Sequence, residues 1–349
     1  MDQIKGAQSI MFREAPYLIS AASVAGSKEA DGPIGKLFDV TDKDDLFGAQ
    51  TWEEAESNMQ KEACVLAAGK AHVDLKKIRY LFGGDLLRQG IATSMGVEAL
   101  QIPMFGLYGA CSTSGEALAL ASMSAAAGYG GTMIAVTSSH FGSAEKEFRF
   151  PLGYANQRPL SSHWTVTGSG AFLVQSAEEY RKQNTKSYFS NIRITGVTVG
   201  KIVDYGLKDS QNMGACMAPA AADTIYQSLV DFEREPKDFD RIITGDLGAV
   251  GQKLLFELLD ENHKDIKKNH MDCGMQIFDE ESQDTHAGGS GCACSALMLS
   301  AVILPKLASG EWKRVLFVPT GALLSQVSAN EGRTIPAIAH AVWLESGRE

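Results

Sequence analysis

The sequence has no long basic run. Of its 349 residues, 32 are Lys or Arg and 42 are Asp or Glu, so the formal net charge is −10 at pH 7. Basic residues never extend beyond a pair such as Lys267-Lys268. A surface that neutralises a phosphate backbone is therefore not expected, and we expect no nucleic-acid partner.

Long apolar runs are missing as well. No uncharged apolar stretch reaches the roughly 18 residues that a membrane-spanning helix needs. The N-terminal residues also lack the basic segment, apolar core and small-residue cleavage site of a secretory signal. We therefore expect a cytoplasmic protein that contacts a membrane only through protein partners.

Cysteine is scarce, with six residues and no Cys-x-x-Cys pair. A secreted disulfide framework is thus not expected, and Cys292 and Cys294 fit small-residue packing at least as well as a metal site. The glycine strings at 167–171 and 288–291 lack the spacing and the lysine of a phosphate-binding loop. We expect no metal and no nucleotide cofactor.

Residues 109–115, Gly-Ala-Cys-Ser-Thr-Ser-Gly, form the most informative stretch that is present. An apolar run precedes them and a helix-spaced run at 116–127 follows, which predicts Cys111 on a strand-to-helix turn. The first turn of a helix carries unpaired N–H groups and partial positive charge, which favour a thiolate or a bound carboxylate. Two functions stay open here: a cysteine nucleophile, or an anion-binding turn that contains a cysteine.

Strands and helices alternate along the chain, which predicts an α/β fold. Thr51 and Glu54 have capping-box spacing before a helix that should run to about residue 69. Residues 75–86 resemble 236–247, each after an amphipathic helix, the second of which is expected at 220–232. Residues 109–112 resemble 292–295 in the same order, so the pattern indicates a duplicated α/β unit.

Candidate partners for Cys111 include several histidines, because a catalytic thiol needs a base or an orienting group. His140 ends a predicted strand, ahead of a polar loop that contains Arg149, Arg158 and His163. His270 and His286 are further candidates, and each of these histidines could equally be a solvated loop residue.

Two aspartates occupy equivalent places in the repeat. Asp85 and Asp246 each follow a predicted strand directly. Either residue could cap the backbone amides that come next, or it could place a carboxylate in a pocket.

These features resemble the thiolase fold of condensing enzymes, and over essentially the whole chain the sequence is similar to the stage V sporulation protein AD family of spore-forming bacteria. The resemblance implies two duplicated αβαβα halves with five-stranded mixed sheets in a layered core, which we place at residues 1–185 and 186–349. The stretches that carry it are residues 28–35, 84–87, 105–114, 137–140, 209–214, 217–225, 269–274, 287–296 (Ala-Gly-Gly-Ser-Gly-Cys-Ala-Cys-Ser-Ala) and 320–325.

The resemblance also implies a function. It implies a homodimer that binds dipicolinic acid (pyridine-2,6-dicarboxylic acid), free or as its calcium chelate, for uptake into the developing spore. Membrane-embedded sporulation channel proteins are the implied partners, which would hold the protein at the inner spore membrane.

The chain departs from active condensing enzymes at two positions. The Cys-His-Asn set of an initiating ketoacyl synthase keeps its cysteine as Cys111, but Asp246 stands in place of the histidine and Ser290 in place of the asparagine. An ionised Asp246 only accepts hydrogen bonds and opposes a developing oxyanion. Each lost oxyanion donor costs about a hundred- to a thousandfold in rate, so we expect binding rather than condensation.

The predicted ligand site gives these residues roles. Ser112 and Thr113 would hold one carboxylate at the helix N-terminus, and His140 would supply a second donor. Calcium, or protonation of Asp246, would remove its repulsion of a dianion. The full predicted set is Cys111, Ser112, Thr113, Ser138, His140, Asp246 and Ser290.

Two other interpretations remain. An acyltransferase would use Cys111 as its catalytic nucleophile with His140 as base. A scaffold with a vestigial crevice would bind only partner proteins.

Overall fold

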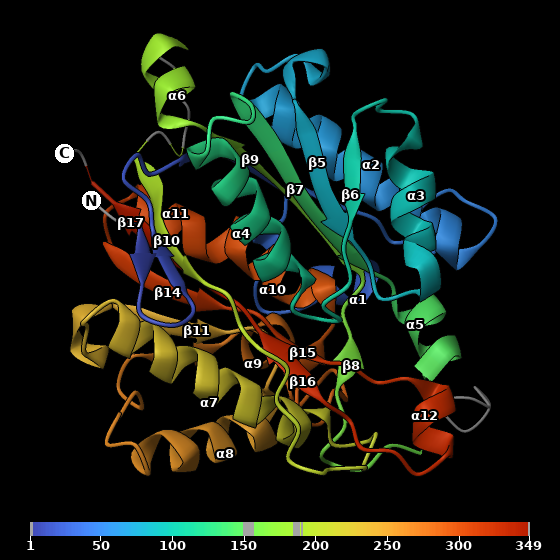
Figure 1. Cartoon of the computed structure of the whole chain (residues 1–349). Helices are drawn as coiled ribbons and strands as arrows, with labels where there is room; N and C mark the ends of the chain where they lie inside the picture. Colours follow the sequence, from blue (N-terminus) through green and yellow to red (C-terminus); the bar gives the residue numbers. More distant parts are fainter. Residues whose placement is uncertain (1–2, 149–156, 184–188, 190, 348–349) are drawn as a thin grey trace.

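The structure is a computed structural model that describes residues 3–148, 157–183, 189 and 191–347 (Figure 1). Its main sheet contains two sets of five strands in equivalent order. The first set runs β3 (Tyr17–Ala25), β9 (Gly168–Gln175), β7 (Thr132–Ser139), β5 (Tyr80–Gly84) and β6 (Met104–Gly106). The second runs β10 (Ile192–Thr198), β17 (Ala341–Ser346), β14 (Arg314–Val318), β11 (Arg241–Thr244) and β12 (His270–Asp272).

Both sets have the same strand directions. The first two pairings are antiparallel and the last two are parallel in each set. The sets join where β3 pairs with β10, at Tyr17 and Arg193. This repetition confirms the predicted α/β fold with duplicated five-stranded mixed sheets, although the predicted boundary at 185/186 lies outside the described residues.

We call the two five-stranded sets the first sheet and the second sheet. Helices form three layers around them. Helix α4 (Thr113–Ala126) and helix α10 (Cys292–Met298) lie between the sheets in Figure 1. A π-helical turn at Leu299–Ile303 extends α10 into α11 (Leu304–Ala308). Helices α2 (Trp52–Lys70) and α3 (Ile91–Glu98) cover the first sheet, while α7 (Met213–Asp231) and α8 (Gly248–Asp260) cover the second. The result is a five-layered αβαβα arrangement.

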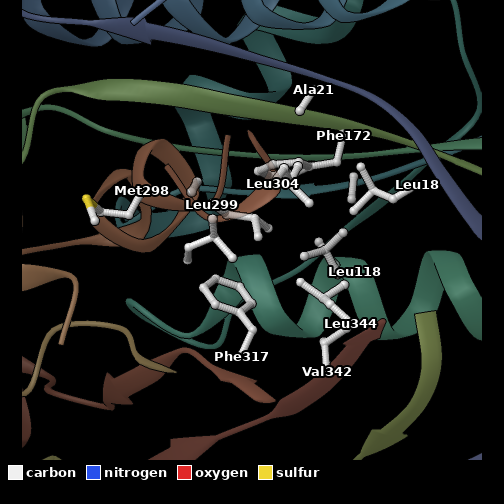
Figure 2. Packing of buried hydrophobic residues seen from close by; sticks show 14 of the residues in the cluster. Leu18, Ala21, Leu118, Phe172, Met298, Leu299, Leu304, Phe317, Val342 and Leu344 are labelled. Carbon is white, nitrogen blue, oxygen red and sulfur yellow. The ribbon is translucent and has the colours of Figure 1, made fainter. Parts of the chain in front are cut away.

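The central helices explain why the core is continuous. Helix α4 is rich in Ala, Ser and Leu, and small side chains let it pack closely against a sheet on each side. Figure 2 shows Leu18 and Phe172 of the first sheet on one side and Phe317 of the second sheet on the other, with Leu118 of α4 and Leu299 between them. Burial of apolar side chains such as these is the dominant favourable contribution to folding.

Several shorter elements complete the chain. Among the described residues, no helix has both the length and the apolar character needed to cross a membrane. The remaining elements are β1 (Ile4–Lys5), β2 (Ser9–Met11), α1 (Ser27–Ala30), β4 (Val40–Thr41), α5 (Phe141–Phe148), β8 (Trp164–Thr165), α6 (Ala177–Gln183), α9 (Gly274–Ile277), β13 (Gly289–Ser290), β15 (Thr320–Ala322), α12 (Gln326–Asn330) and β16 (Ala337–Ala339).

The segment directly after His140 differs from the prediction. Residues 141–148 form helix α5, where we expected a polar loop. Ser143 of this helix donates a hydrogen bond to the buried carboxyl of Glu56 on α2 (3.1 Å). The buried face of α5 is therefore partly polar, which hides the helical pattern in the sequence. Arg149 lies outside the described residues.

Candidate functional site

Cys111 lies on the predicted turn immediately before α4. The preceding residue, Ala110, has φ of +50°, a left-handed conformation that side chains other than glycine rarely adopt. Its carbonyl oxygen accepts hydrogen bonds from Thr113 N (3.1 Å), Thr113 Oγ1 (2.7 Å) and Cys292 Sγ (3.0 Å). These three bonds hold the turn in place and so fix the position of the thiol.

A cavity opens beside this turn, and both Cys111 and Ser290 are in its wall. Its volume is about 40 Å³, which corresponds to about three water molecules. Residues from both halves of the chain complete the wall, among them Tyr108, Glu145, Phe148, His163, Thr165 and Gln211. The structure therefore brings together the two predicted wall residues, Cys111 and Ser290.

Asp246 lies next to Cys111 but is not part of the cavity wall. Its carboxylate accepts hydrogen bonds from Gly291 N (3.0 Å) and Thr320 Oγ1 (2.8 Å), and the thiol of Cys111 lies close enough to interact with it. Burial raises the pKa of Asp246 to about 7, although these hydrogen bonds act to lower it.

The Asp246 carboxylate also affects the protonation state of Cys111. Burial, and then the negative charge of Asp246, raise the pKa of the Cys111 thiol well above its usual value. A nucleophilic cysteine needs a lowered pKa, because the thiolate is the reactive form. Burial and the neighbouring Asp246 charge therefore keep Cys111 in its thiol form.

The hydroxyl groups of Ser112 and Thr113 are already bonded within the turn. Ser112 Oγ donates to Gly109 O (2.6 Å), and Thr113 Oγ1 donates to Ala110 O while accepting from Gly109 N (3.1 Å). The backbone amides of both residues donate to the same two carbonyls at 3.1 Å. Their role as carboxylate donors stays a prediction, and it would require these bonds to be exchanged.

Ser138 and His140 lie away from the cavity wall. Ser138 Oγ donates to Glu56 Oε1 (2.8 Å) and accepts from Gln60 Nε2 (3.0 Å), inside the first half. His140 Nε2 lies 2.6 Å from Asp45 O, and its Nδ1 accepts from Gly142 N (3.1 Å). Burial lowers the pKa of His140, so the imidazole is neutral. Their ligand roles, and that of His140 as a base, stay predictions.

The other candidate residues have local partners. His270 lies 3.0 Å from both Thr244 Oγ1 and Gln252 Nε2, and burial lowers its pKa to about 4. Asp85 accepts from Leu87 N and Thr93 N, both at 2.8 Å, as the capping interpretation predicts. Among the residues that the structure describes, no three His, Cys, Asp or Glu side chains are placed to hold a metal ion.

Sequence reasoning missed several wall residues. Glu145 and Phe148 belong to α5, which we expected as a loop, and Thr165 Oγ1 donates to Glu145 Oε1 (3.1 Å). The buried Glu145 carboxyl places an acid in the cavity wall. A helix assigned to 141–148 would have been the signal that pointed to both residues.

Comparison with known proteins places the chain in a family. The family model described as Stage V sporulation protein AD (SpoVAD) matches residues 6–345. The chain belongs to the stage V sporulation protein AD family. The stage V sporulation protein AD of Bacillus subtilis (strain 168) is 40% identical over 343 residues, which cover 98% of each chain.

Solved structures related to this family member share its fold at low sequence identity. Human mitochondrial 3-ketoacyl-CoA thiolase matches with a TM-score of 0.59 and 12% identity, covering 96% of this chain and 99% of the thiolase. The 3-oxoacyl-(acyl carrier protein) synthase III of Pseudomonas aeruginosa matches with a TM-score of 0.55 and 12% identity over 96% and 99% of the two chains. These similarities confirm the thiolase fold.

Replacing Asp246 by asparagine is expected to make Cys111 more reactive. Removal of the carboxylate charge lowers the pKa of the thiol, and each pKa unit gives about tenfold more thiolate near neutral pH. The measurement is the rate of iodoacetamide labelling at pH 8, followed by mass spectrometry of the Cys111 peptide.

The Cys64 peptide from the same digest serves as an internal control, since Cys64 is buried in the first half and not beside Asp246. Equal Cys111 labelling rates in the wild type and in Asp246→Asn, with Cys64 unlabelled in both, would contradict this account of the pair.

Proposed function

We propose that this sporulation protein binds dipicolinic acid in the Cys111 cavity without converting it. The observation that carries the proposal is the Cys111–Asp246 pair, which keeps the cysteine of a condensing-enzyme turn protonated. A cavity of this kind can still bind a ligand when its cysteine is protonated and therefore unreactive. Membership of the stage V sporulation protein AD family is the reason for proposing a ligand that is connected with sporulation.

The cavity wall supports the proposed ligand class. Tyr108 and Phe148 offer aromatic surface, while Ser162, Thr165 and Gln211 offer polar groups. Dipicolinate has a flat ring and two carboxylates, and ligand sites typically combine an apolar wall with a few polar groups. A volume of about 40 Å³ is too small for the intact ligand, so binding requires wall side chains to move.

Charge sets a condition on binding. The carboxyls of Glu145 and Asp246 would repel a free dianion. A calcium ion chelated by dipicolinate would cancel the ligand's charge, and a protonated Asp246 would remove one negative group. Because the pKa of Asp246 is about 7, its protonated form is populated near neutral pH.

Isothermal titration calorimetry tests the proposal directly. We expect pyridine-2,6-dicarboxylate to bind. Its affinity should be higher with equimolar calcium than without it, and higher at pH 6 than at pH 8. Benzene-1,3-dicarboxylate, which has the same shape but no ring nitrogen to chelate calcium, should bind at least about tenfold more weakly in the presence of calcium.

Variants locate the site. Ser290→Leu fills the cavity and should weaken binding by at least about tenfold. The matched control is Ser309→Leu, because Ser309 is an exposed residue at the end of α11. Binding that Ser290→Leu leaves unchanged would place the ligand elsewhere, and no heat with either ligand form would support the scaffold interpretation.

The acyltransferase alternative keeps one favourable observation, the left-handed Ala110 that presents Cys111 at the start of α4. Intact mass spectrometry after incubation with acyl-CoA distinguishes the two functions. A stable acyl adduct on Cys111 would support the enzyme, and its absence supports the binder.

We also propose a homodimer that associates along β6. This strand forms one end of the main sheet, and its three residues, including Met104 and Phe105, are exposed. An exposed strand edge with apolar side chains is suited to pairing with a second copy. Light scattering on the purified chain should give the mass of two copies, and a single-copy mass at micromolar concentration would contradict this proposal. Membrane-embedded partners stay a prediction.

A further inference from the structure

Arg158 is a buried cation with unmet hydrogen-bonding capacity. Its side chain is 4% exposed, and its Nη2 atom donates to Asp284 Oδ2 (2.8 Å) and Asp284 O (2.9 Å). Among the described residues, its Nε and Nη1 atoms have no hydrogen-bond partner. Leaving guanidinium donors unpaired in the interior is costly, so such a group is suited to an additional acceptor.

Other basic groups surround the same carboxylate. Lys28 Nζ lies 4.5 Å from the centre of the Trp164 ring, and the Arg158 guanidinium lies 5.0 Å from it. His286 Nε2 lies 3.0 Å from Asp284 Oδ1. Arg158 and His286 therefore pair with the Asp284 carboxylate, and Lys28 lies close enough to interact with its charge.

The nearby acids do not balance this cluster. Lys28 Nζ donates to a neutral carbonyl, that of Gln283 (2.6 Å). Glu29 is the other acid near Lys28, and burial raises its pKa to about 8, so it is mostly neutral at pH 7. Asp284 is the acid that pairs directly with Arg158 and His286.

Asp284 is placed so that another anion could replace it. Its side chain is 76% exposed and projects from residues 278–288, which connect α9 to β13. The basic groups beneath it come from other segments: Lys28 from α1 and Arg158 from the segment before β8. Rotation of the Asp284 side chain alone would open the cluster, because Arg158 and Lys28 would keep their hydrogen bonds to the backbone carbonyls of Asp284 and Gln283.

The cluster is separate from the Cys111 cavity. Thr165 and His163 line that cavity, whereas Trp164 between them does not. Successive side chains of a strand point to opposite sides, so Trp164 and its cations lie on the reverse side of β8.

We propose that Arg158 and Lys28, with Trp164 between them, form a second site for a small oxyanion, and that Asp284 occupies this site in the free protein. The ligand class is a carboxylate or phosphate with at least two anionic oxygens, which a guanidinium binds in bidentate fashion. The proposal does not depend on dipicolinate binding in the Cys111 cavity.

Removing the internal competitor tests the site. An intramolecular carboxylate competes at an effective concentration in the millimolar range, so Asp284→Asn should bind a free oxyanion at least about tenfold more tightly than the wild type. The probes are inorganic phosphate and malonate, each titrated by calorimetry at constant ionic strength. A preference for one probe identifies the anionic group that the site takes.

Matched variants complete the experiment. Asp279→Asn removes an exposed charge from the same connection and should leave the affinity unchanged. Adding Arg158→Gln or, separately, Lys28→Gln to Asp284→Asn should abolish the gain, with folding checked by circular dichroism. Equal affinity in Asp284→Asn and Asp279→Asn would overturn the proposal, as would tight binding that survives both added substitutions. Using the Ser290→Leu background keeps any binding in the Cys111 cavity out of the measurement.

Discussion

Between pH 7 and pH 9, the free energy of unfolding is expected to fall by on the order of 3 kcal/mol. Three fully buried carboxyls contribute about this much, because burial raises the pKa of Glu29 and of Glu56 to about 8 and that of Asp246 to about 7. In the unfolded chain these groups ionise near pH 4. Their stabilising contribution is complete below that pH and is lost progressively as the pH rises from there through the folded pKa values of about 7 to 8. Buried thiols such as Cys64 and Cys111, whose pKa burial also raises, add to the fall above pH 8.

Buried histidines do not mask the effect in this window. Burial lowers the pKa of His270 and of His340 to about 4, so both are neutral above pH 7 in the folded protein. In the unfolded chain they are also mostly neutral there. Equilibrium urea unfolding at pH 7, 8 and 9 measures the slope.

Glu56→Gln isolates one of the three groups. The two Glu56 oxygens accept from the hydroxyls of Ser138 and Ser143, which can rotate to accommodate an amide. The variant should lose about 1 kcal/mol of the pH-dependent change, while Glu62→Gln at an exposed position of the same helix should lose none. A wild-type stability that rises from pH 7 to pH 9, or an unchanged slope in Glu56→Gln, would refute this explanation.

Replacing Phe317 by alanine is expected to lower the free energy of unfolding by about 3–5 kcal/mol. Phe317 lies on β14, is fully buried, and in Figure 2 points toward Leu299 in the layer between the sheets. Truncation removes apolar contacts and leaves a cavity that sheets on both sides cannot close.

Urea unfolding at pH 7, monitored by circular dichroism, measures this loss. The matched surface control is Tyr129→Ala, because Tyr129 is 70% exposed, and its effect should stay within about 0.5 kcal/mol. A loss below about 1 kcal/mol for Phe317→Ala would show that the layer repacks around the gap.

The sequence predicted the fold well because the repeated segments correspond to equivalent strands of the two sheets. The Gly-Asp pairs at Asp85 and Asp246 mark the ends of the equivalent strands β5 and β11. Half of the predicted capping box is confirmed: Thr51 Oγ1 accepts from Glu54 N (3.2 Å) at the start of α2, whereas the Glu54 carboxylate accepts from Gln50 N (3.1 Å) and not from Thr51 N. The second repeat helix begins earlier than the predicted residue 220, as α7 (Met213–Asp231), because Asn212 caps it and the buried Pro219 is tolerated in its second turn.

The candidate site was less predictable, for two physical reasons. Ser138 and Ser139 are adjacent on β7 and point to opposite sides, and two serines in sequence do not reveal which side faces the crevice. Ser138 faces Glu56, whereas Ser139 Oγ accepts from Ala293 N (3.1 Å) near the crevice. His140 bonds a carbonyl of the loop around Asp45, a contact far along the chain that no local pattern indicates.

The turn at Ala110 has a consequence for ligand binding. A left-handed alanine costs about 1–2 kcal/mol, and the three donors on its carbonyl maintain that conformation without any ligand. The Cys111 side of the cavity is therefore preorganised: a ligand loses no affinity by ordering it. The entropy cost of binding should instead arise on the opposite wall, where Phe148 ends α5, so rigidifying that wall is the more promising route to tighter binding.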